Sequence, residues 1–324
     1  MKAAIVTAEG LRLSDAPEPK PKPNEVLVRV RAAGLNRADI GVASGQAHGR
    51  IGGPGTIPGL EFAGEVVEVG AEVPAEIRPG QRVMCSGAGG YAEYAVADWG
   101  RVAPVPDANM GWEQAATLPV ALQTMHDAVV TNGGLRRGES ILIQGASSGV
   151  GLMGMQIAKL MGAARVLGSS TDPGRRARLA EFGCDLAIDT TDPAWPEQVL
   201  KATGGRGVEV IVDQVSGALA NGNLRCCAIL GRIVNVGRLG GARAEFDFDL
   251  HALRRIRYIG VTFRTRSVEE VREIARRMRE DLWPAVEAGT LRLPIDRVFP
   301  LAEAAEALAH MKANRHFGKV VLAC

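Results

Sequence analysis

The stretch Gly145-Ala146-Ser147-Ser148-Gly149-Val150-Gly151 follows an apolar strand candidate, Ile141-Leu142-Ile143, and opens a helix candidate that starts near Val150. Small residues in such a turn let backbone N–H groups approach an anion, and the positive end of the helix dipole adds to the attraction. Gly151 permits close packing of the helix on the strand. We therefore predict a phosphate-binding turn, because the strand-turn-helix context carries more weight than the glycine pattern alone.

Two known dinucleotide-binding sequence patterns can be compared with this turn. The GxGxxG pattern retains only its last glycine, at Gly151, whereas the GxxxGxG pattern of short-chain dehydrogenases is satisfied literally. Short-chain enzymes also need a catalytic TyrxxxLys, but two of the three tyrosines precede the turn and Thr262 stands four residues after Tyr258. The short-chain interpretation therefore fails. An ordinary strand-to-helix turn without a ligand stays as the alternative.

The middle of the chain alternates between apolar strands and helices. Strands are expected at 141–143, 165–168, 186–188, 208–212 and 233–236, with helices at 152–161 and 175–182. This pattern predicts a parallel, doubly wound sheet over residues 121–260, which is a Rossmann nucleotide-binding domain.

The two ends of the chain have a different pattern. Residues 1–120 contain short strand candidates at 25–31, 60–69 and 91–96, separated by turn residues, which predicts a β-rich domain. Residues 261–324 contain helix candidates at 268–288 and 301–312 and a last strand at 318–322. We expect this tail to complete the first domain, so the predicted fold class is α/β with a β-rich domain and a Rossmann domain.

Composition excludes several classes of protein. Hydrophobic residues make up 46% of the 324 residues, and 38 basic residues nearly balance 36 acidic ones, so neither nucleic acid nor a membrane is an expected partner. No signal peptide core and no apolar run of about 18 residues is present, which predicts a cytoplasmic location. Five dispersed cysteines without a CxxC pair are typical of a reducing compartment.

The residues after the second Rossmann strand predict the cofactor. NAD-binding folds usually carry a carboxylate there, but this chain has Ser169 and Ser170, whose hydroxyls can donate to a 2′-phosphate. Arg175 or Arg176 can pair with the same phosphate. We therefore predict NADPH, with its pyrophosphate at Ser148, Gly149, Val150 and Gly151. Asp172 argues for NADH, but we expect it to cap the following helix instead.

Several separate motifs resemble the quinone oxidoreductase branch of the medium-chain dehydrogenase/reductase superfamily, the zeta-crystallin-like enzymes. Besides the phosphate turn they are Ala33-Gly34-Leu35-Asn36-Arg37-Ala38-Asp39, Pro58-Gly59-Leu60-Glu61-Phe62-Ala63-Gly64, Gly89-Gly90-Tyr91-Ala92-Glu93-Tyr94, 118–124 and Phe317-Gly318-Lys319-Val320-Val321-Leu322. The resemblance implies a GroES-like catalytic domain that encloses a cleft against the nucleotide domain, and usually a homodimer.

The resemblance also implies an enzyme without a metal. The catalytic zinc ligands of the alcohol dehydrogenases in this superfamily would fall at Asn36, Leu60 and Val120, none of which binds zinc, and the four-cysteine lobe is missing. A reductase without that Lewis acid suits quinones and α,β-unsaturated carbonyls, because conjugation spreads the incoming charge.

Site residues follow from the same resemblance. Asn36 would hydrogen-bond near the nicotinamide and the substrate, and Thr124 would contact the nicotinamide side. The remaining residues expected along the cofactor are Val215, Ser216, Asn235, Val236, Gly237, Phe263, Arg264, Thr265, Phe317, Gly318 and Lys319.

The substrate itself stays open between several candidates. Residues 41–50 contain no aromatic side chain, whereas bacterial quinone reductases carry tyrosines there, and aromatic residues make up only 4% of the chain. Few aromatic rings are therefore available to stack on a quinone, which favours enones and enals as substrates. The alternatives are an enoyl reductase that acts on carrier-bound acyl chains and a non-catalytic, crystallin-like protein that binds NADPH.

Overall fold

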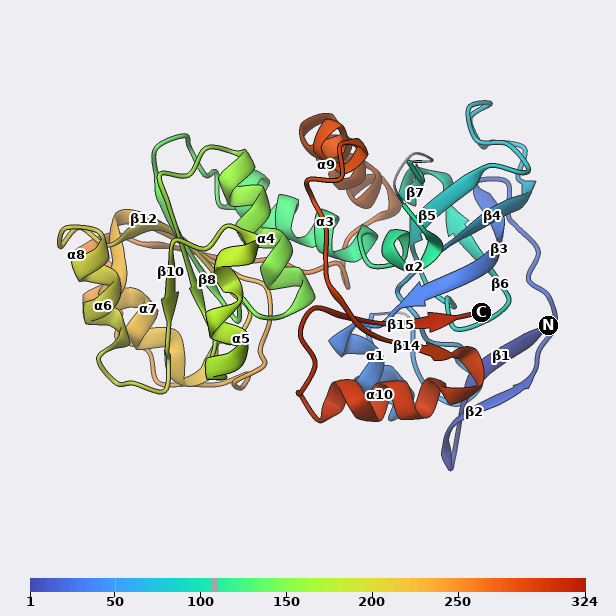
Figure 1. Cartoon of the computed structure of the whole chain (residues 1–324), viewed down its shortest axis with the longest axis horizontal. Helices are drawn as coiled ribbons and strands as arrows, with labels where there is room; N and C mark the ends of the chain where they lie inside the picture. Colours follow the sequence, from blue (N-terminus) through green and yellow to red (C-terminus); the bar gives the residue numbers. More distant parts are fainter. Residues whose placement is uncertain (50, 107–109) are drawn as a thin grey trace. The chain divides into compact units, whose positions relative to one another are not determined.

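The computed structural model describes residues 1–49, 51–106 and 110–324. Within them the chain forms two compact units. Unit 1 comprises Met1–Val120 together with Phe263–Cys324, and unit 2 comprises Ala121–Thr262. The chain therefore begins and ends in unit 1, and unit 2 is one continuous segment (Figure 1).

Unit 2 contains the predicted doubly wound sheet. Its strands are β8 (Ser140–Gln144), β9 (Arg165–Ser169), β10 (Leu186–Ile188), β11 (Val208–Asp213), β12 (Cys227–Asn235) and β13 (Arg257–Gly260). They pair in parallel in the order β10-β9-β8-β11-β12-β13. The order changes direction at β8, between β9 and β11, and the carboxyl ends of strands at such a point form the usual ligand crevice of an open sheet.

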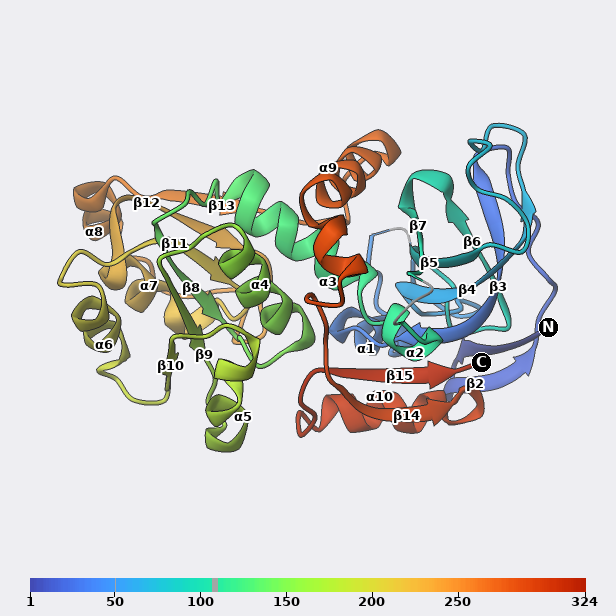
Figure 2. The same cartoon turned by 45° about the horizontal axis from the view of Figure 1, so that its top comes forward.

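Helices cover both faces of this sheet. They are α3 (Pro119–His126, continued by a π-helix over Asp127–Asn132), α4 (Gly149–Leu160), α5 (Pro173–Ala177), α6 (Trp195–Ala202), α7 (Ala220–Cys226) and α8 (Phe248–Arg254). In Figures 1 and 2, α4 and α5 lie on one side of the sheet, and α6 and α7 lie on the other. The latter side buries an apolar cluster that includes Leu142, Trp195 and Leu224.

One predicted helix is wrong in its extent. The expected helix over 175–182 is instead the short helix α5 followed by a 3₁₀ turn over Leu179–Phe182. Arg178 between them has ψ near 0° (φ −92°, ψ −6°), and Gly183 ends the turn with φ +89°. The side chain of Asp172 and the ring of Pro173 start α5 two residues earlier than predicted.

Unit 1 is built on a mostly antiparallel sheet. The strands of this sheet are β3 (Glu25–Gly34), β4 (Glu61–Val69), β5 (Arg82–Ser86), β6 (Tyr94–Asp98), β7 (Val102–Pro104), β14 (Ile295–Pro300) and β15 (Lys319–Ala323). Strands β1 (Lys2–Thr7) and β2 (Gly10–Asp15) form a separate two-stranded sheet. The main order is β14-β15-β3-β4-β5-β7, with β6 also on β3. Strand β15 pairs with β3, for example Val321 with Gly34, so the C-terminal tail is part of this sheet.

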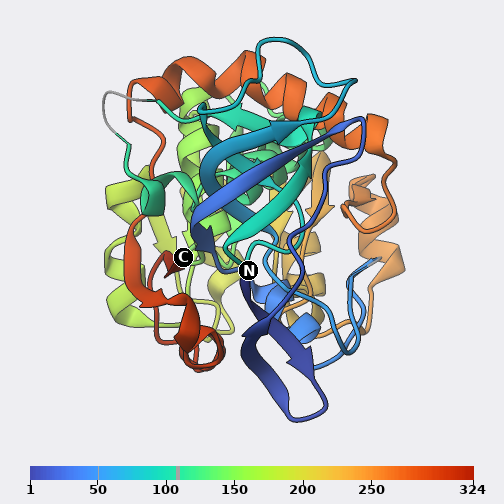
Figure 3. The same cartoon turned by 90° about the vertical axis from the view of Figure 1, so that its right-hand side faces the viewer.

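Few helices accompany the strands of unit 1. They are α1 (Arg37–Ala43), α2 (Trp112–Ala115), α9 (Val268–Glu287) and α10 (Ala304–Lys312). A capping box of Ser267 and Glu270 starts α9, and its apolar stripe is buried at Val271, Met278 and Leu282. Figure 3 shows α9 above the sheet, and the β1–β2 hairpin projecting from the rest of the unit.

Candidate functional site

The predicted phosphate turn joins β8 to α4 in unit 2. Ser148 is the N-cap of α4, and its hydroxyl oxygen accepts a hydrogen bond from the Gly151 backbone N–H at 3.0 Å. The same hydroxyl lies 3.1 Å from Oε1 of Gln214, at the end of β11. The turn is therefore tied to the neighbouring strand as well as to its own helix.

Close backbone contacts inside the turn explain its glycines. Gly145 has φ +74°, a conformation that disfavours residues with a side chain. A Cβ on Gly151 would lie 2.6 Å from the carbonyl oxygen of Gly145 and 2.7 Å from Cα of Ala146. The start of α4 thus lies directly against the turn, as a backbone cradle for a phosphate group requires. The residues present fit the pyrophosphate of a dinucleotide.

The end of β9 presents hydroxyl groups to this turn. Ser170 Oγ donates to Ser147 Oγ at 3.0 Å, and Ser169 Oγ accepts a bond from the Gly145 N–H at 3.0 Å. Asp172 Oδ1 accepts the Arg175 N–H at 2.7 Å, so the prediction that Asp172 caps this helix is confirmed. Ser147 was not predicted as a site residue, although its position within the phosphate turn pointed to it.

Arginine side chains of α5 border the same strand end. Arg176 donates to the carbonyl of Ser170 at 2.8 Å and forms an ion pair with Asp189 at 2.9 Å. Arg175 Nε lies 3.7 Å from Oδ1 of Asp172, and its side chain is mostly buried. Positive charge is therefore present beside the serine hydroxyls.

A buried polar network organises the ends of β11 and β12. Asp213 Oδ1 accepts the backbone N–H groups of Val215 and Ser216, both at 2.8 Å, and its Oδ2 accepts from Asn223 at 2.9 Å. Burial raises the pKa of Asp213, although these hydrogen bonds lower it. Asn235 Nδ2 donates to the Ser216 hydroxyl. Three predicted residues, Val215, Ser216 and Asn235, are thereby close in space. Asp213, which binds the first two, was not predicted.

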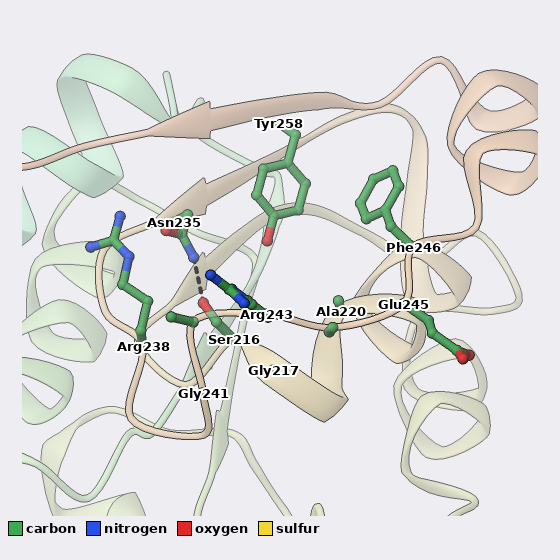
Figure 4. A pocket seen from close by; sticks show the side chains of 12 residues that line it. Ser216, Gly217, Ala220, Asn235, Arg238, Gly241, Arg243, Glu245, Phe246 and Tyr258 are labelled. Atoms are coloured by element: carbon green, nitrogen blue, oxygen red, sulfur yellow. Dashed lines mark hydrogen bonds between the residues drawn. The ribbon is translucent and has the colours of Figure 1, made fainter.

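A pocket of about 270 Å³ lies next to this network (Figure 4). Two of the predicted cofactor residues line it, and the side chain of Tyr258 extends from β13 towards them. Its lining includes Ser216, Asn235, Arg238, Arg243, Phe246 and Tyr258.

A second cluster of polar side chains is buried in unit 1. Asn36, the N-cap of α1, donates from Nδ2 to Oε1 of Glu61 at 2.9 Å. Lys319 at the start of β15 donates from Nζ to Oδ1 of Asn36 at 3.2 Å and forms an ion pair with Glu61. Glu61 was not predicted as a site residue, although its place in the Pro58–Gly64 motif was a signal.

Asp39 lies beneath this cluster and is fully buried. Its Oδ2 accepts bonds from the Asn36 backbone N–H at 2.8 Å and from the Tyr91 hydroxyl at 2.9 Å. Its Oδ1 has no hydrogen-bond partner among the described residues. Burial raises the pKa of Asp39 to about 6, against the hydrogen bonds and the charge of Lys319, which lower it. The carboxyl group of Asp39 is therefore protonated below about pH 6 and mostly ionised above it.

The remaining predicted residues are distributed over both units. Arg264 and Thr265 lie in an exposed turn of unit 1, where Arg264 is close to Gly49. Burial and, to a smaller extent, the charge of Arg264 lower the pKa of His48. The backbone N–H of Phe317 donates to Asp296 at 3.1 Å. Thr124 belongs to unit 2, on α3, and is partly buried.

The donor set at the positions of the zinc ligands is unsuitable for zinc. Asn36, Leu60 and Val120 supply one amide and two alkyl side chains. Among residues 1–49, 51–106 and 110–324, no cluster of His, Cys, Asp or Glu could hold a metal ion. Within the same ranges, no helix is long and apolar enough to cross a membrane.

Fold and site together define a two-domain dehydrogenase or reductase. Residues 22–107 match the family model described as alcohol dehydrogenase GroES-like domain, and residues 149–280 match the one described as zinc-binding dehydrogenase. The chain belongs to the quinone oxidoreductase-like family of medium-chain dehydrogenases/reductases. The predicted fold class, a GroES-like domain plus a Rossmann domain, is confirmed.

Individual relatives support this assignment. Quinone oxidoreductase-like protein 2 of Bos taurus is 30% identical over 306 residues, which cover 94% of this chain and 86% of the relative. A mycobacterial protein solved in complex with NADPH superposes with a TM-score of 0.88 at 27% identity, over 100% of both chains. The family is therefore one of pyridine nucleotide-dependent oxidoreductases.

Much longer proteins are also similar to this chain. The highly reducing polyketide synthase easB of Emericella nidulans is 28% identical over 305 residues, which are 93% of this chain. The chain spans only 12% of that synthase, and 5% to 14% of others like it.

Proposed function

We propose that this protein is an NADPH-dependent, zinc-independent reductase that transfers hydride to a quinone or an α,β-unsaturated carbonyl compound. The observation that carries the cofactor assignment is the backbone cradle at Gly151 beside the hydroxyl pair of Ser147 and Ser170. A 2′-phosphate gains hydrogen bonds from hydroxyls and a nearby arginine, whereas a carboxylate in their place would repel it.

The proposed cofactor contacts begin at the adenosine end. Ser148, Gly149, Val150 and Gly151 bind the pyrophosphate, and Ser169, Ser170 and Arg175 surround the 2′-phosphate. The further contacts are Val215, Ser216, Asn235, Val236, Gly237, Phe263, Arg264, Thr265, Phe317, Gly318 and Lys319, the last through its backbone because its side chain is directed to Asn36 and Glu61. The hydrogen bonds that join Asp213, Ser216 and Asn235 support the unit 2 part of this set, since they hold these loops in one conformation before the cofactor arrives.

Asn36 and Thr124 are the proposed catalytic residues. Bound NADPH supplies the hydride from C4 of its nicotinamide. Asn36 donates a hydrogen bond to the acceptor carbonyl, and Thr124 orients the nicotinamide side of the cofactor. With an amide and two alkyl side chains at the zinc-ligand positions, no strong Lewis acid assists a simple carbonyl, so a conjugated acceptor that delocalises the incoming charge is favoured.

Steady-state NADPH oxidation tests this function. We expect the protein to reduce at least one of three substrate classes, namely quinones, enones and enals, with higher rates for the enones and enals. We also expect a much smaller kcat in Asn36→Ala. Fluorescence titration should first verify NADPH binding. If bound NADPH is not oxidised by any of the three classes, the protein is a non-catalytic nucleotide-binding protein and the proposed reductase function is wrong.

The similarity to polyketide synthases favours a second candidate function, an enoyl reductase that acts on thioester-linked acyl chains. Such a substrate is also a conjugated carbonyl compound, and its reduction requires no catalytic side chains beyond those already proposed. Crotonyl thioesters of a small pantetheine mimic and of a carrier protein distinguish the two candidates. A kcat/KM for the thioesters well above that for free enones supports the second one.

We also propose a homodimer, as the family resemblance implies. Strand β13 is at the end of the unit 2 sheet, and Phe248 and Leu253 on α8 are 75% and 73% exposed. An unpaired strand edge beside exposed apolar side chains is typical of an interface. Light scattering measures the mass directly, and a monomer at micromolar concentration contradicts this proposal.

A further inference from the structure

We infer that Glu61 and Lys319 are positioning residues that hold the side-chain amide of Asn36 in a single orientation, with its N–H group available to the substrate. This inference rests on the proposed function of Asn36. It adds two residues of unit 1 that act through Asn36 and that need not touch the substrate.

The contacts of Lys319 account for its whole hydrogen-bonding capacity. Nζ donates to the Leu35 carbonyl at 2.7 Å, to Asn36 Oδ1 at 3.2 Å and to Glu61 Oε1. An ammonium group has three N–H donors, and these three acceptors match them. Its side chain is only 4% exposed. Lys319 is thereby directed into unit 1 and onto Asn36.

These contacts decide which way the Asn36 amide faces. Oδ1 faces the ammonium of Lys319, and Nδ2 faces the carboxylate of Glu61 at 2.9 Å. A rotation of the amide by 180° would place its NH₂ group against the ammonium and its oxygen against the carboxylate. Both new contacts would be repulsive in a buried site, so the observed orientation is strongly preferred. The second N–H of Nδ2 makes only a long contact of 3.5 Å with the Gly34 carbonyl oxygen. It is therefore the N–H that can turn to a substrate carbonyl as donor.

The fold holds each member of the cluster from outside. Glu61 Oε2 accepts the Val120 backbone N–H at 2.8 Å, and Asp39 Oδ2 accepts the Asn36 backbone N–H at 2.8 Å. Gly318 has φ +86°, and a Cβ there would lie 2.2 Å from the carbonyl oxygen of Pro294. This close approach allows the Lys319 backbone N–H to bond the same carbonyl at 2.9 Å. The cluster is therefore rigid before any ligand binds.

A double-mutant cycle tests the inference, with Lys319→Met made in the wild type and in Asn36→Ala. If Lys319 acts through Asn36, Lys319→Met lowers kcat by at least about 10-fold in the wild type. In the Asn36→Ala background it lowers kcat by less than about 2-fold, because the group that it positions is gone. The dissociation constant of NADPH, measured by fluorescence, stays within about 2-fold in both backgrounds.

Other outcomes overturn the inference in separate ways. Multiplicative losses of kcat in the two backgrounds mean that Lys319 does not act through Asn36. An increase of about 10-fold or more in the NADPH dissociation constant with unchanged kcat assigns Lys319 to the cofactor instead. If Asn36→Ala itself leaves kcat unchanged, the proposed function of Asn36 fails, which is a different result from failure of the positioning role.

Two further variants serve as a replacement for Lys319→Met and as a control. Glu61→Gln/Lys319→Met removes both charges together, so it leaves no unpaired buried ion and replaces Lys319→Met if that variant does not fold. The same loss of kcat and the same dependence on Asn36 are expected for it. Glu65→Gln, on the same strand as Glu61 and paired with Arg31 at 3.0 Å in a half-exposed position, is the matched control and should keep the wild-type kcat.

Discussion

The hydroxyl of Ser170 donates a hydrogen bond to the hydroxyl of Ser147 at 3.0 Å, which joins the end of β9 to the phosphate turn. The two residues are 23 positions apart in the chain, and both are at least partly buried. In a Rossmann domain this is the region of the adenosine ribose. The proposed 2′-phosphate site rests on these neutral hydroxyls and on the neighbouring arginines of α5.

Ser170→Asp combined with Arg175→Ala should change the cofactor preference. The new carboxylate repels a 2′-phosphate and accepts bonds from ribose hydroxyls, so the ratio of kcat/KM for NADPH to that for NADH should fall about 10- to 100-fold. Arg178→Ala is the control, because Arg178 pairs with Glu181 in an exposed position. An unchanged ratio in the double variant refutes the assignment of these residues to the 2′-phosphate.

Gly151→Ala should damage both stability and cofactor binding. The added Cβ would meet backbone atoms of Gly145 and Ala146 at 2.6 and 2.7 Å, and backbone cannot move aside as a flexible side chain can. We expect a loss of about 1–3 kcal/mol in the free energy of unfolding and NADPH binding about 10-fold weaker or worse. Gly174→Ala, whose Cβ has only an ordinary contact at 3.4 Å, should change neither quantity.

Stability should depend on pH through Asp39. Because the pKa of this buried carboxyl group is about 6 in the folded protein and ordinarily 3.8, the folded state binds more protons than the unfolded chain between these pH values. The protonated carboxyl group makes its full contribution to the free energy of unfolding below about pH 4. As the pH rises through about 6 this contribution is lost, and the free energy of unfolding falls by about 3 kcal/mol. Denaturant unfolding at several pH values should show this decline in the wild type and not in Asp39→Asn, and parallel curves would contradict it.

Arg232→Met should destabilise unit 2. Arg232 donates to the carbonyls of Gly133 and Gly134, both at 2.7 Å, and pairs with Glu139 at 2.6 Å, with the arginine side chain 7% exposed. Its loss leaves a carboxylate and two carbonyls without their donor, which should cost about 3–5 kcal/mol of unfolding free energy. Arg225→Met is the control, since its ion pair with Glu197 is exposed and should contribute at most about 1 kcal/mol.

Local patterns predicted much of the fold. The strand, turn and helix around Gly151, the parallel sheet of unit 2 and the cap formed by Asp172 all depend on residues close together in the chain. The helix predicted over 175–182 was too regular, because the segment shifts to a 3₁₀ turn at Leu179. Periodicity of apolar residues does not distinguish an α-helix from a 3₁₀ turn when the segment is short.

The sequence by itself determined the family, and it predicted the turn and the hydroxyls on which the NADPH proposal rests, because each depends on short motifs whose local geometry follows from residue type. Only the tertiary structure decided what surrounds Asn36. Lys319 reaches Glu61 across 258 positions in the chain, and that contact exists because β15 pairs with β3 and β4 pairs with β3 on its other side. Burial then gives the ion pair its strength and Asp39 its high pKa, since both effects require that water be excluded by residues far apart in the sequence.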